Sequence, residues 1–280
     1  MLFPKKERNP KTKKMKSTSW GNVARWYDEV IESKDSYQRS LILPNLLRLM
    51  EIQRGERILD LACGQGFFAR AFCEAGGKVT AADISKELID IARTNLAKQN
   101  SHGQAKQGFK ESIDYHVAPA HALHFIQNES IDKIAVVLAL QNIENLNEVL
   151  VECARVLTVR GKLYMILNHP AFRIPKESSW GFDERAHVQY RRIDRYLSNT
   201  KMRIDMHPGR KSGEQTISFH RPLQTYIKAL FKQSLCVRRL EEWSSGKKSE
   251  RGPRATAEDK ARKEIPLFLA IEAQKVLCLD

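Results

Sequence analysis

The segment Ile58–Phe68 constrains the fold of this 280-residue chain more than any other. It begins with an apolar run typical of a buried strand and continues into Cys63-Gly64-Gln65-Gly66, where two glycines allow a sharp turn and a close approach to a ligand. The following helix would direct its free N–H groups into that turn. A second apolar run ends in Asp83, whose carboxylate can bind both hydroxyls of a ribose. This order predicts a nucleoside-containing cofactor at the carboxyl ends of a parallel sheet.

Asp60 separates two candidate cofactors. The spacing Gly64-x-Gly66-x-x-Ala69 also satisfies the loose dinucleotide fingerprint, which alone is weak evidence. A carboxylate beside the turn would repel an anionic pyrophosphate, whereas it would attract the ammonium of an amino acid. We therefore favour a cofactor that carries an amino acid. A nicotinamide enzyme and a turn that serves only chain reversal stay open as alternatives.

The run from Asp60 to Gly66 resembles the first motif of the class I S-adenosylmethionine-dependent methyltransferases, in which an acid precedes a glycine-rich turn. The resemblance implies S-adenosyl-L-methionine as cofactor, with Asp60 and the Gly64 backbone at its methionine end. It also implies that Asp83 holds the ribose and that Ile84 packs against adenine. The cofactor-binding residues expected on this basis are Asp60, Ala62, Gly64, Gly66, Asp83, Ile84, Ala120, Leu140 and Tyr27. Tyr27 is included because residues 24–28 resemble a family segment that folds over the cofactor.

Two further strand ends bear on the reaction. Residues 118–121 stand where many relatives carry Gly-Asp-Ala-Glu, so Pro119 replaces an adenine-binding aspartate and backbone groups near Ala120 would take over. Residues 139–142 lack the Asn-Pro-Pro-Tyr-like motif of nucleic-acid amino-methyltransferases and the Pro-Cys pair of cytosine C5 enzymes. They also offer no carboxylate for magnesium. We therefore expect no metal, and we favour a small-molecule acceptor over a nucleic acid.

The predicted fold is α/β: a Rossmann-like, doubly wound, seven-stranded and mostly parallel sheet with an antiparallel last strand. It carries an N-terminal helical cap and an insertion after strand five. Strands are expected at 57–62, 78–83, 113–118, 133–140, 162–168, 236–242 and 265–272, and helices at 20–32, 37–50, 66–75, from Ser85 onward, at 143–157 and at 222–233. The stretch 244–263 is expected to be a polar loop, and 201–219 a hairpin turning at Pro208-Gly209.

The expected organisation is a disordered basic tail over 1–18 and one methyltransferase domain over 19–280. Within the domain we expect the cap at 19–54, the cofactor-binding core at 55–168, a substrate-lid insertion at 169–221 and a C-terminal helix with a strand hairpin at 222–280. Seven lysines and arginines lie in the first sixteen residues against one glutamate, within a formal net charge of +14. The tail could make weak nucleic-acid contacts through counterion release, or it could only aid solubility.

Other compositional features favour a cytoplasmic protein. The sequence has no run of eighteen apolar residues, so no membrane span is expected. The N-terminus lacks the apolar region of a secretory signal. Five cysteines without a CxxC pair suggest reduced thiols and no zinc site. The sequence does not fix the oligomeric state.

Substrate chemistry is expected around the insertion, which mixes aromatic side chains with arginines. His169 is the first candidate for a general base because it follows strand five at the ligand edge, although a structural role is the plainer alternative. The expected substrate contacts are Gln141, Asn142, Arg173, Tyr190 and Arg191. The insertion and C-terminus loosely resemble ubiquinone and menaquinone C-methyltransferases. The leading hypothesis is O- or C-methylation of a small molecule. An RNA or protein methyltransferase that uses the tail, or a non-catalytic S-adenosylmethionine-binding regulator, remain alternatives.

Overall fold

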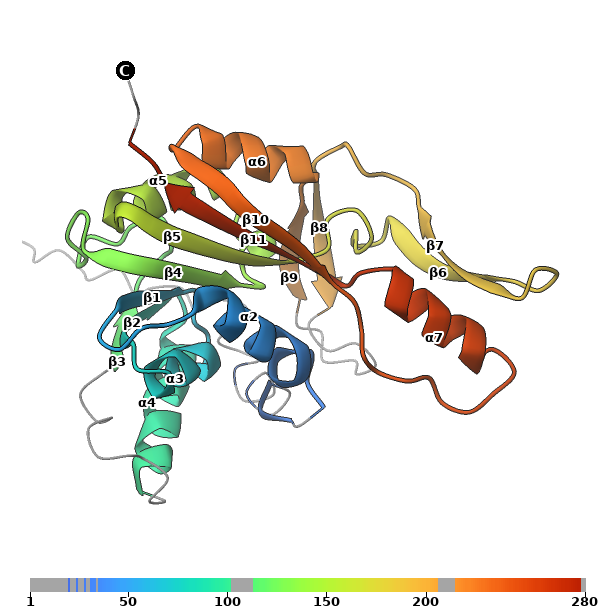
Figure 1. Cartoon of the computed structure of the whole chain (residues 1–280), viewed down its shortest axis with the longest axis horizontal. Coiled ribbons are helices and arrows are strands. Elements are labelled where there is room, and N and C mark those ends of the chain that lie inside the picture. Colours follow the sequence, from blue (N-terminus) through green and yellow to red (C-terminus); the bar gives the residue numbers. More distant parts are fainter. Residues whose placement is uncertain are drawn as a thin grey trace, which may run out of the picture.

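A seven-stranded sheet organises the chain in the computed structural model, which describes residues 20, 24, 28, 31–33, 35–101, 113–205 and 215–277 (Figure 1). The strands are β1 (Arg57–Leu61), β2 (Lys78–Asp83), β3 (Ile113–Val117), β4 (Ile131–Val137), β5 (Leu157–Asn168), β10 (Leu235–Trp243) and β11 (Phe268–Lys275). Their order is β10-β11-β5-β4-β1-β2-β3, and β11 alone runs in the direction opposite to the other six. The predicted fold class is confirmed.

Helices cover both faces of this sheet. On one face lie the π-helix η2 (Gln38–Ile42), α2 (Leu43–Met50), α3 (Phe67–Glu74) and α4 (Lys86–Ser101), and on the other lie α5 (Leu146–Val156) and α6 (Leu223–Phe231) (Figure 1). Alternate residues of β1 serve the two cores: Ile58 packs with the α2–α3 side, and Leu59 and Leu61 pack with the α5–α6 side. A strand buried on both faces should be apolar, and the four buried positions of β1, residues 58–61, meet this need except at Asp60, while Arg57 at its start is exposed.

Local sequence signals explain where two of the helices begin. The Leu88 N–H donates to Ser85 Oγ at 3.3 Å, so Ser85 caps α4 as expected. Pro44 lies in the first turn of α2 directly after η2, where the helix changes from π-helical to α-helical hydrogen bonding. Of the helix expected over 20–32, residues 24, 28, 31 and 32 are described and are helical, whereas Trp20 is described as part of a turn; the rest, with Tyr27, lies outside the described residues. The basic tail also lies outside them.

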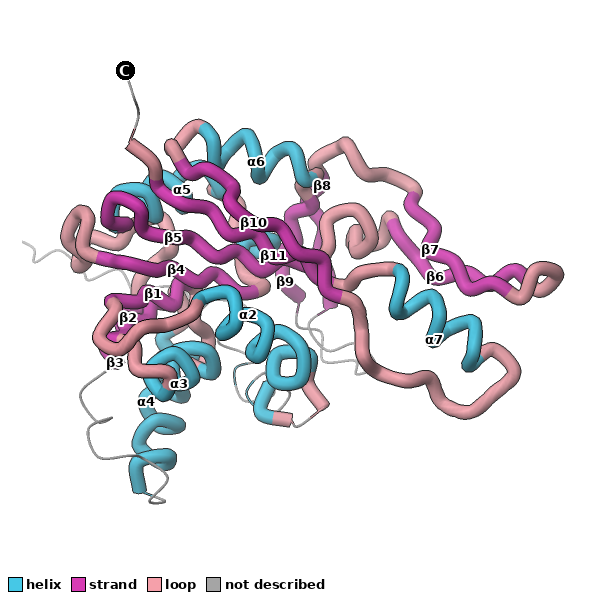
Figure 2. Tube along the Cα trace, in the orientation of Figure 1, coloured by secondary structure: helices cyan, strands magenta, loops and turns pink. Residues whose placement is uncertain are grey.

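The insertion after β5 forms two antiparallel hairpins. One pairs β6 (Ser178–Asp183) with β7 (Val188–Ile193), and the other pairs β8 (Thr200–Asp205) with β9 (Gln215–His220). The second confirms the hairpin expected over 201–219, although its turn at Pro208-Gly209 lies outside the described residues. The first was not predicted. The β8–β9 hairpin lies near the carboxyl ends of β4 and β5, while β6–β7 extends away from the sheet beside α7 (Figure 2).

Several expected elements differ from the structure, including strand five, which begins at Leu157 and not at residue 162. The polar loop expected over 244–263 contains α7 (Ala255–Glu264), which is held by charge patterning such as the Glu258–Arg262 pair rather than by an apolar face. The helix expected over 143–157 begins at Leu146, and the strand expected over 133–140 ends at Val137. The intervening chain includes the 3-10 helix η4 (Leu140–Asn142). The subdivision of residues 19–280 stays a prediction.

The connection between β3 and β4 is fastened to α5 by Arg155. Its guanidinium donates to the carbonyls of Leu123 at 3.0 Å and Ile126 at 2.9 Å, and its Nε donates to Glu152 at 2.7 Å. Glu152 in turn accepts the Leu123 N–H at 2.7 Å. This network fixes the segment that follows residues 118–121.

We expect Arg155→Ala to lower the free energy of unfolding by about 1–3 kcal/mol, because several carbonyls and a carboxylate lose a charged donor together. Arg155→Lys should recover little of this loss, since one ammonium cannot reach the same spread of acceptors. Urea unfolding measures both variants against Arg185→Ala, which removes a guanidinium from the exposed β6–β7 turn. Equal stability of Arg155→Ala and Arg185→Ala would show that the network does not hold the connection.

Candidate active site

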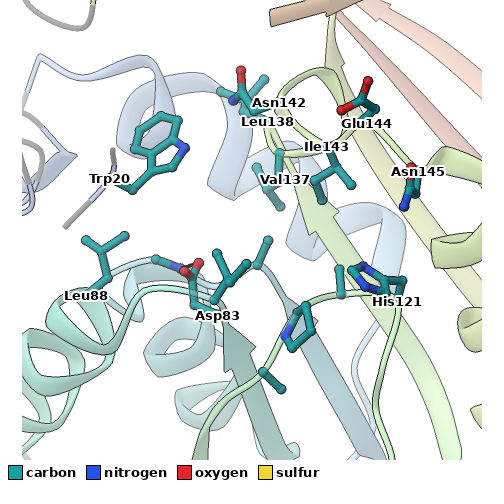
Figure 3. A pocket seen from close by; sticks show the side chains of 17 residues that line it. Trp20, Asp83, Leu88, His121, Val137, Leu138, Asn142, Ile143, Glu144 and Asn145 are labelled. Carbon is teal, nitrogen blue, oxygen red and sulfur yellow. Dashed lines mark hydrogen bonds between the residues drawn. The ribbon is translucent and has the colours of Figure 1, made fainter. Parts of the chain in front are cut away.

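A cavity of about 290 Å³ lies at the carboxyl ends of β1 to β4 (Figure 3). The residues that line it come from four strand ends, from α4 and from the N-terminal segment. They are Ala62 and Gly64 after β1, Asp83 and Ile84 at β2, residues 118–121 after β3, residues 137–139 and 142–145 after β4, Leu88 of α4, and Trp20. In Figure 3, Trp20 and Leu88 lie on one side and Glu144 and Asn145 on the other. Parallel strands in an open α/β sheet place ligand sites at this edge.

The glycine turn forms the floor of the cavity. Ala62, Gly64 and Gly66 all have left-handed backbones, with φ of 59°, 57° and 79°. Ala62 and Gly64 line the cavity, and Gly66 does not. A side chain at Gly66 would place its Cβ 2.6 Å from the hydroxyl of Tyr115 on β3. Gly66 is therefore required for close packing of the turn against the sheet, whereas Ala62 and Gly64 present backbone to a ligand.

Asp83 is held rigidly at the carboxyl end of β2. Its carboxylate accepts the Gly64 N–H at 2.9 Å and the Ser85 N–H at 2.8 Å. Burial raises the pKa of this carboxyl, and these backbone hydrogen bonds oppose the rise. Each carboxylate oxygen keeps a further lone pair. The Asp83 carboxylate is thus a fixed hydrogen-bond acceptor on the cavity wall, at the position where the sequence predicts a ribose-binding acid.

Asp60 lies behind the turn and does not line this cavity. It is 1% exposed, and its Oδ2 has no hydrogen-bond partner among the described residues. Burial raises its pKa to about 7; a backbone hydrogen bond from Ala69 lowers it, and the nearby Asp83 charge raises it. A positive charge bound over the turn would favour the ionised form of this carboxyl. The unpaired oxygen therefore fits a site for a cationic ligand group.

The remaining wall is mostly apolar. Ile84 exposes 46% of its surface and, with Leu88 and Pro119, offers a contact area suited to a flat ring. Ala120 also lines the cavity, whereas Leu140 is buried in the core beneath it. An apolar slot that ends at a fixed acid matches the dimensions and polarity expected for a nucleoside. Fold and site together define a nucleoside-cofactor-binding α/β protein.

The expected substrate residues divide into three places. Asn142 lines the main cavity, and its neighbour Gln141 lines a second, smaller cavity together with Arg173. Tyr190 and Arg191 lie on β7 and line neither of these cavities; Tyr190 packs over Gly181. The structure therefore brings Gln141 and Arg173 together across 32 residues of sequence, while Tyr190 stays at the extended hairpin.

His169 is engaged at the junction of β5 and β10. It is 5% exposed, its Nε2 is 2.7 Å from Glu242 Oε1, and its Nδ1 accepts the Ala171 N–H at 3.2 Å. Burial lowers the pKa of the imidazole, and Glu242 partly opposes this. His169 does not line the main cavity, and its role as a base stays a prediction. The ionisable side chains that line the cavity besides Asp83 are His121 and Glu144.

Sequence reasoning also missed part of the wall after β4. Val137, Leu138, Ile143, Glu144 and Asn145 line the cavity because β4 ends earlier, and α5 begins later, than expected. The strand-end argument that selected Asn142 would have found them with the correct boundaries. Nothing in the sequence around Trp20 indicated that it lines the cavity, because its place there depends on the path of the N-terminal segment relative to the strand ends.

Known proteins share these features. Residues 59–165 match the sequence model of a family described as "Methyltransferase domain". A ubiquinone biosynthesis O-methyltransferase of Xanthomonas oryzae pv. oryzae is 29% identical over 146 residues, which cover 50% of this chain and 55% of that protein. A ubiquinone/menaquinone biosynthesis C-methyltransferase of Hydrogenovibrio crunogenus is 29% identical over 159 residues, covering 56% and 59%. The chain thus spans little more than half the length of these curated relatives.

A solved structure agrees with this relationship. The S-adenosylmethionine-dependent methyltransferase from Mesorhizobium loti aligns with a TM-score of 0.61 at 25% identity, covering 82% of this chain and 96% of that one. The chain thus contains a methyltransferase domain over residues 59–165 and is similar in sequence and fold to the class I S-adenosylmethionine-dependent methyltransferase superfamily. The cofactor of this superfamily is S-adenosylmethionine, as the glycine turn and its two acids indicated.

The unpaired Asp60 carboxyl generates a pH-dependent prediction. Its pKa of about 7 in the folded state exceeds the value of 3.8 expected when unfolded, so the folded state binds this proton more tightly. Stability from this group is therefore lost as pH rises from about 4 to about 7. Asp60→Asn should be more stable than the native chain, with a gap that widens over this range to the order of a few kcal/mol. It should also bind a cationic ligand more weakly.

Urea unfolding of the ligand-free protein at about pH 5 and about pH 8 measures this gap. Asp35→Asn, which neutralises an exposed carboxylate, is the matched control. A gap of the same size at both pH values would mean that Asp60 keeps an ordinary pKa.

Proposed function

We propose that this chain transfers a methyl group from S-adenosylmethionine to oxygen or carbon of a small-molecule acceptor. The main observation behind the proposal is that the glycine turn and Asp83 line the same cavity. The buried Asp60 lies behind that turn. Two acids with raised pKa values face or adjoin a cavity that, among the described residues, no lysine or arginine lines. The cofactor brings an ammonium and a sulfonium, which supply the missing positive charge.

The residues suit the cofactor part by part. The Ala62 and Gly64 backbone, with Asp60 behind it, would hold the methionine end. Asp83 would accept the ribose hydroxyls. Ile84 and Ala120 would enclose the adenine, with Leu140 supporting them from the core. These assignments follow from the placement of each residue on the cavity wall or immediately beneath it. Tyr27 remains a proposed lid residue.

The chemistry asks the protein mainly to hold the acceptor. When bound, the cofactor supplies a methyl group already activated by the sulfonium. The apolar wall of Ile84, Leu88 and Leu138 excludes water, and fixed alignment of the acceptor can contribute about 7–11 kcal/mol to the rate. A proton released from a hydroxyl or an activated carbon can pass to His121 or Glu144 at the cavity wall. Within the described residues, no cluster of three His, Cys, Asp or Glu side chains could hold a metal.

Three observations favour a small-molecule acceptor. The relatives named above are quinone-biosynthesis methyltransferases. The cavity has a volume of about 290 Å³, close to the lower end of the range for small-molecule sites, with Trp20 and Glu144 on different sides of it (Figure 3). The β8–β9 hairpin of the insertion lies near the strand ends, as a substrate lid would. None of the helices in the described part of the chain is long and apolar enough to cross a bilayer. A cytoplasmic location is part of the proposal.

We expect S-adenosylhomocysteine to bind the native chain in calorimetry and NAD to bind negligibly. Asp83→Ala should weaken S-adenosylhomocysteine binding by about 1–3 kcal/mol, the usual loss when a charged hydrogen-bond acceptor is removed. Asp35→Ala should leave the affinity unchanged. Because Asp83 also holds the Gly64 N–H, a melting curve must show that the variant is folded. Full affinity in folded Asp83→Ala would refute the assignment.

A second function is favoured by the basic N-terminal tail, which suits RNA. Deleting residues 1–16 should leave methyl transfer to a small molecule nearly unchanged, because every described residue that lines the cavity lies at Trp20 or later in the chain. An RNA methyltransferase should instead lose affinity and much of its salt dependence. Radiolabelled transfer into a metabolite extract and into total RNA compares the two. Cofactor binding without transfer to any extract would indicate a non-catalytic regulator.

A further inference from the structure

A second cavity of about 30 Å³ lies on the other side of the η4 wall. Asn142 faces the main cavity, whereas the adjacent Gln141 lines the second one. The wall between them is fixed by Arg221, which is 8% exposed and donates to the carbonyls of Leu140 at 3.0 Å and of Ile143 and Glu144 at 2.7 Å. The two cavities therefore share a rigid partition, and one ligand could contact both sides of it.

Positive charge accumulates around this second cavity without an acid to balance it. Arg173 and Arg221 line it, and Arg191 lies close enough to Arg173 for the two charges to repel. None of the three guanidinium groups forms an ion pair with a carboxylate among the described residues; Arg191 and Arg221 donate only to uncharged oxygens. Like charges held together favour the binding of an anion.

The backbone on either side of Arg173 is fixed in a position from which its guanidinium could bind such an anion. Arg191 donates to the Phe172 carbonyl and to Ser178 Oγ, both at 2.7 Å, and Ser178 Oγ bonds both backbone groups of Ile174 at 2.9 Å. These contacts brace the segment on either side of Arg173. The Arg173 guanidinium stacks over the Phe268 ring at 5.6 Å, which leaves the donors on its edge available.

Size and polarity restrict the anion. A water occupies about 10–15 Å³ by this measure of volume, so the cavity holds two or three oxygen-sized atoms. That matches the two oxygens of a carboxylate better than the three free oxygens of a phosphate. Gln141 Oε1 is buried and lacks a donor among the described residues, so a water or hydroxyl beside the carboxylate would satisfy it.

We propose that the second cavity binds a carboxylate of the methyl acceptor through Arg173, so that the acceptor is a small organic acid held across the Gln141–Asn142 wall. This inference rests on the proposed function. Arg173 is the binding residue, and Arg191 and Arg221 position it and the wall. The substrate class follows from the unbalanced charge and the small volume, neither of which belongs to the cofactor cavity.

Fluorine NMR tests the inference with para-fluorobenzoate and its neutral analogue para-fluorobenzamide. The native chain should bind the benzoate at least about tenfold more tightly than the amide, because only the carboxylate pairs with Arg173. Arg173→Gln should reduce the benzoate to the affinity of the amide. Arg203→Gln, which removes another exposed charge, on β8, should leave it within about twofold. Arg173→Glu should reverse the preference toward para-fluorobenzylamine.

Each contrary outcome is decisive. Equal affinity of benzoate and amide, or equal losses in Arg173→Gln and Arg203→Gln, would overturn the carboxylate site. Tighter binding of para-fluorophenyl phosphate would overturn the choice of carboxylate. S-adenosylhomocysteine calorimetry separates the two proposals: native affinity in Arg173→Gln with no benzoate preference removes only this inference, whereas no binding by the native chain removes the proposed function.

Discussion

The hydrogen bond from the Gly64 N–H to the Asp83 carboxylate connects the two parts of the sequence on which the site depends. Strands β1 and β2 are parallel neighbours, with Leu61 opposite Ala82. Asp83 is therefore the first residue of β2 beyond the last paired position of β1, where the chain has already entered the turn. The 2.9 Å contact fixes the turn and the acid in one geometry. Without it, the Gly64 N–H in the left-handed turn and the buried Asp83 carboxylate would each need another hydrogen-bond partner.

The opposite wall depends on a contact between distant segments. Arg221, the last residue of the insertion, reaches carbonyls of the β4–α5 connection about eighty residues earlier. The insertion returns to the sheet through β9, which packs against η4. A segment that could have been only a lid over the substrate is thus also a structural part of the cofactor cavity. Changes in the insertion should accordingly affect both ligands.

Sequence reasoning succeeded where apolar burial or backbone geometry left a local signal. The buried strands and the turn at Ala62 to Gly66 were predictable because both faces of β1 are covered and because close packing against Tyr115 demands glycine. The β6–β7 hairpin and α7 gave no such signal, since their side chains are largely exposed. The position of His169 was predictable, but its partner was not: Glu242 lies 73 residues later on a strand whose neighbours only the sheet order reveals.

The unpaired carboxyl of Asp60 should make the lifetime of the protein depend on the concentration of its ligand. A buried acid without a partner weakens the empty fold, and a bound cation relieves that cost, so ligand affinity and resistance to unfolding rise together. In a cell, proteases remove the transiently opened chain in proportion to its population. The abundance of this protein should therefore follow the concentration of its methyl donor, and starvation for that donor should shorten its lifetime before any change in its synthesis.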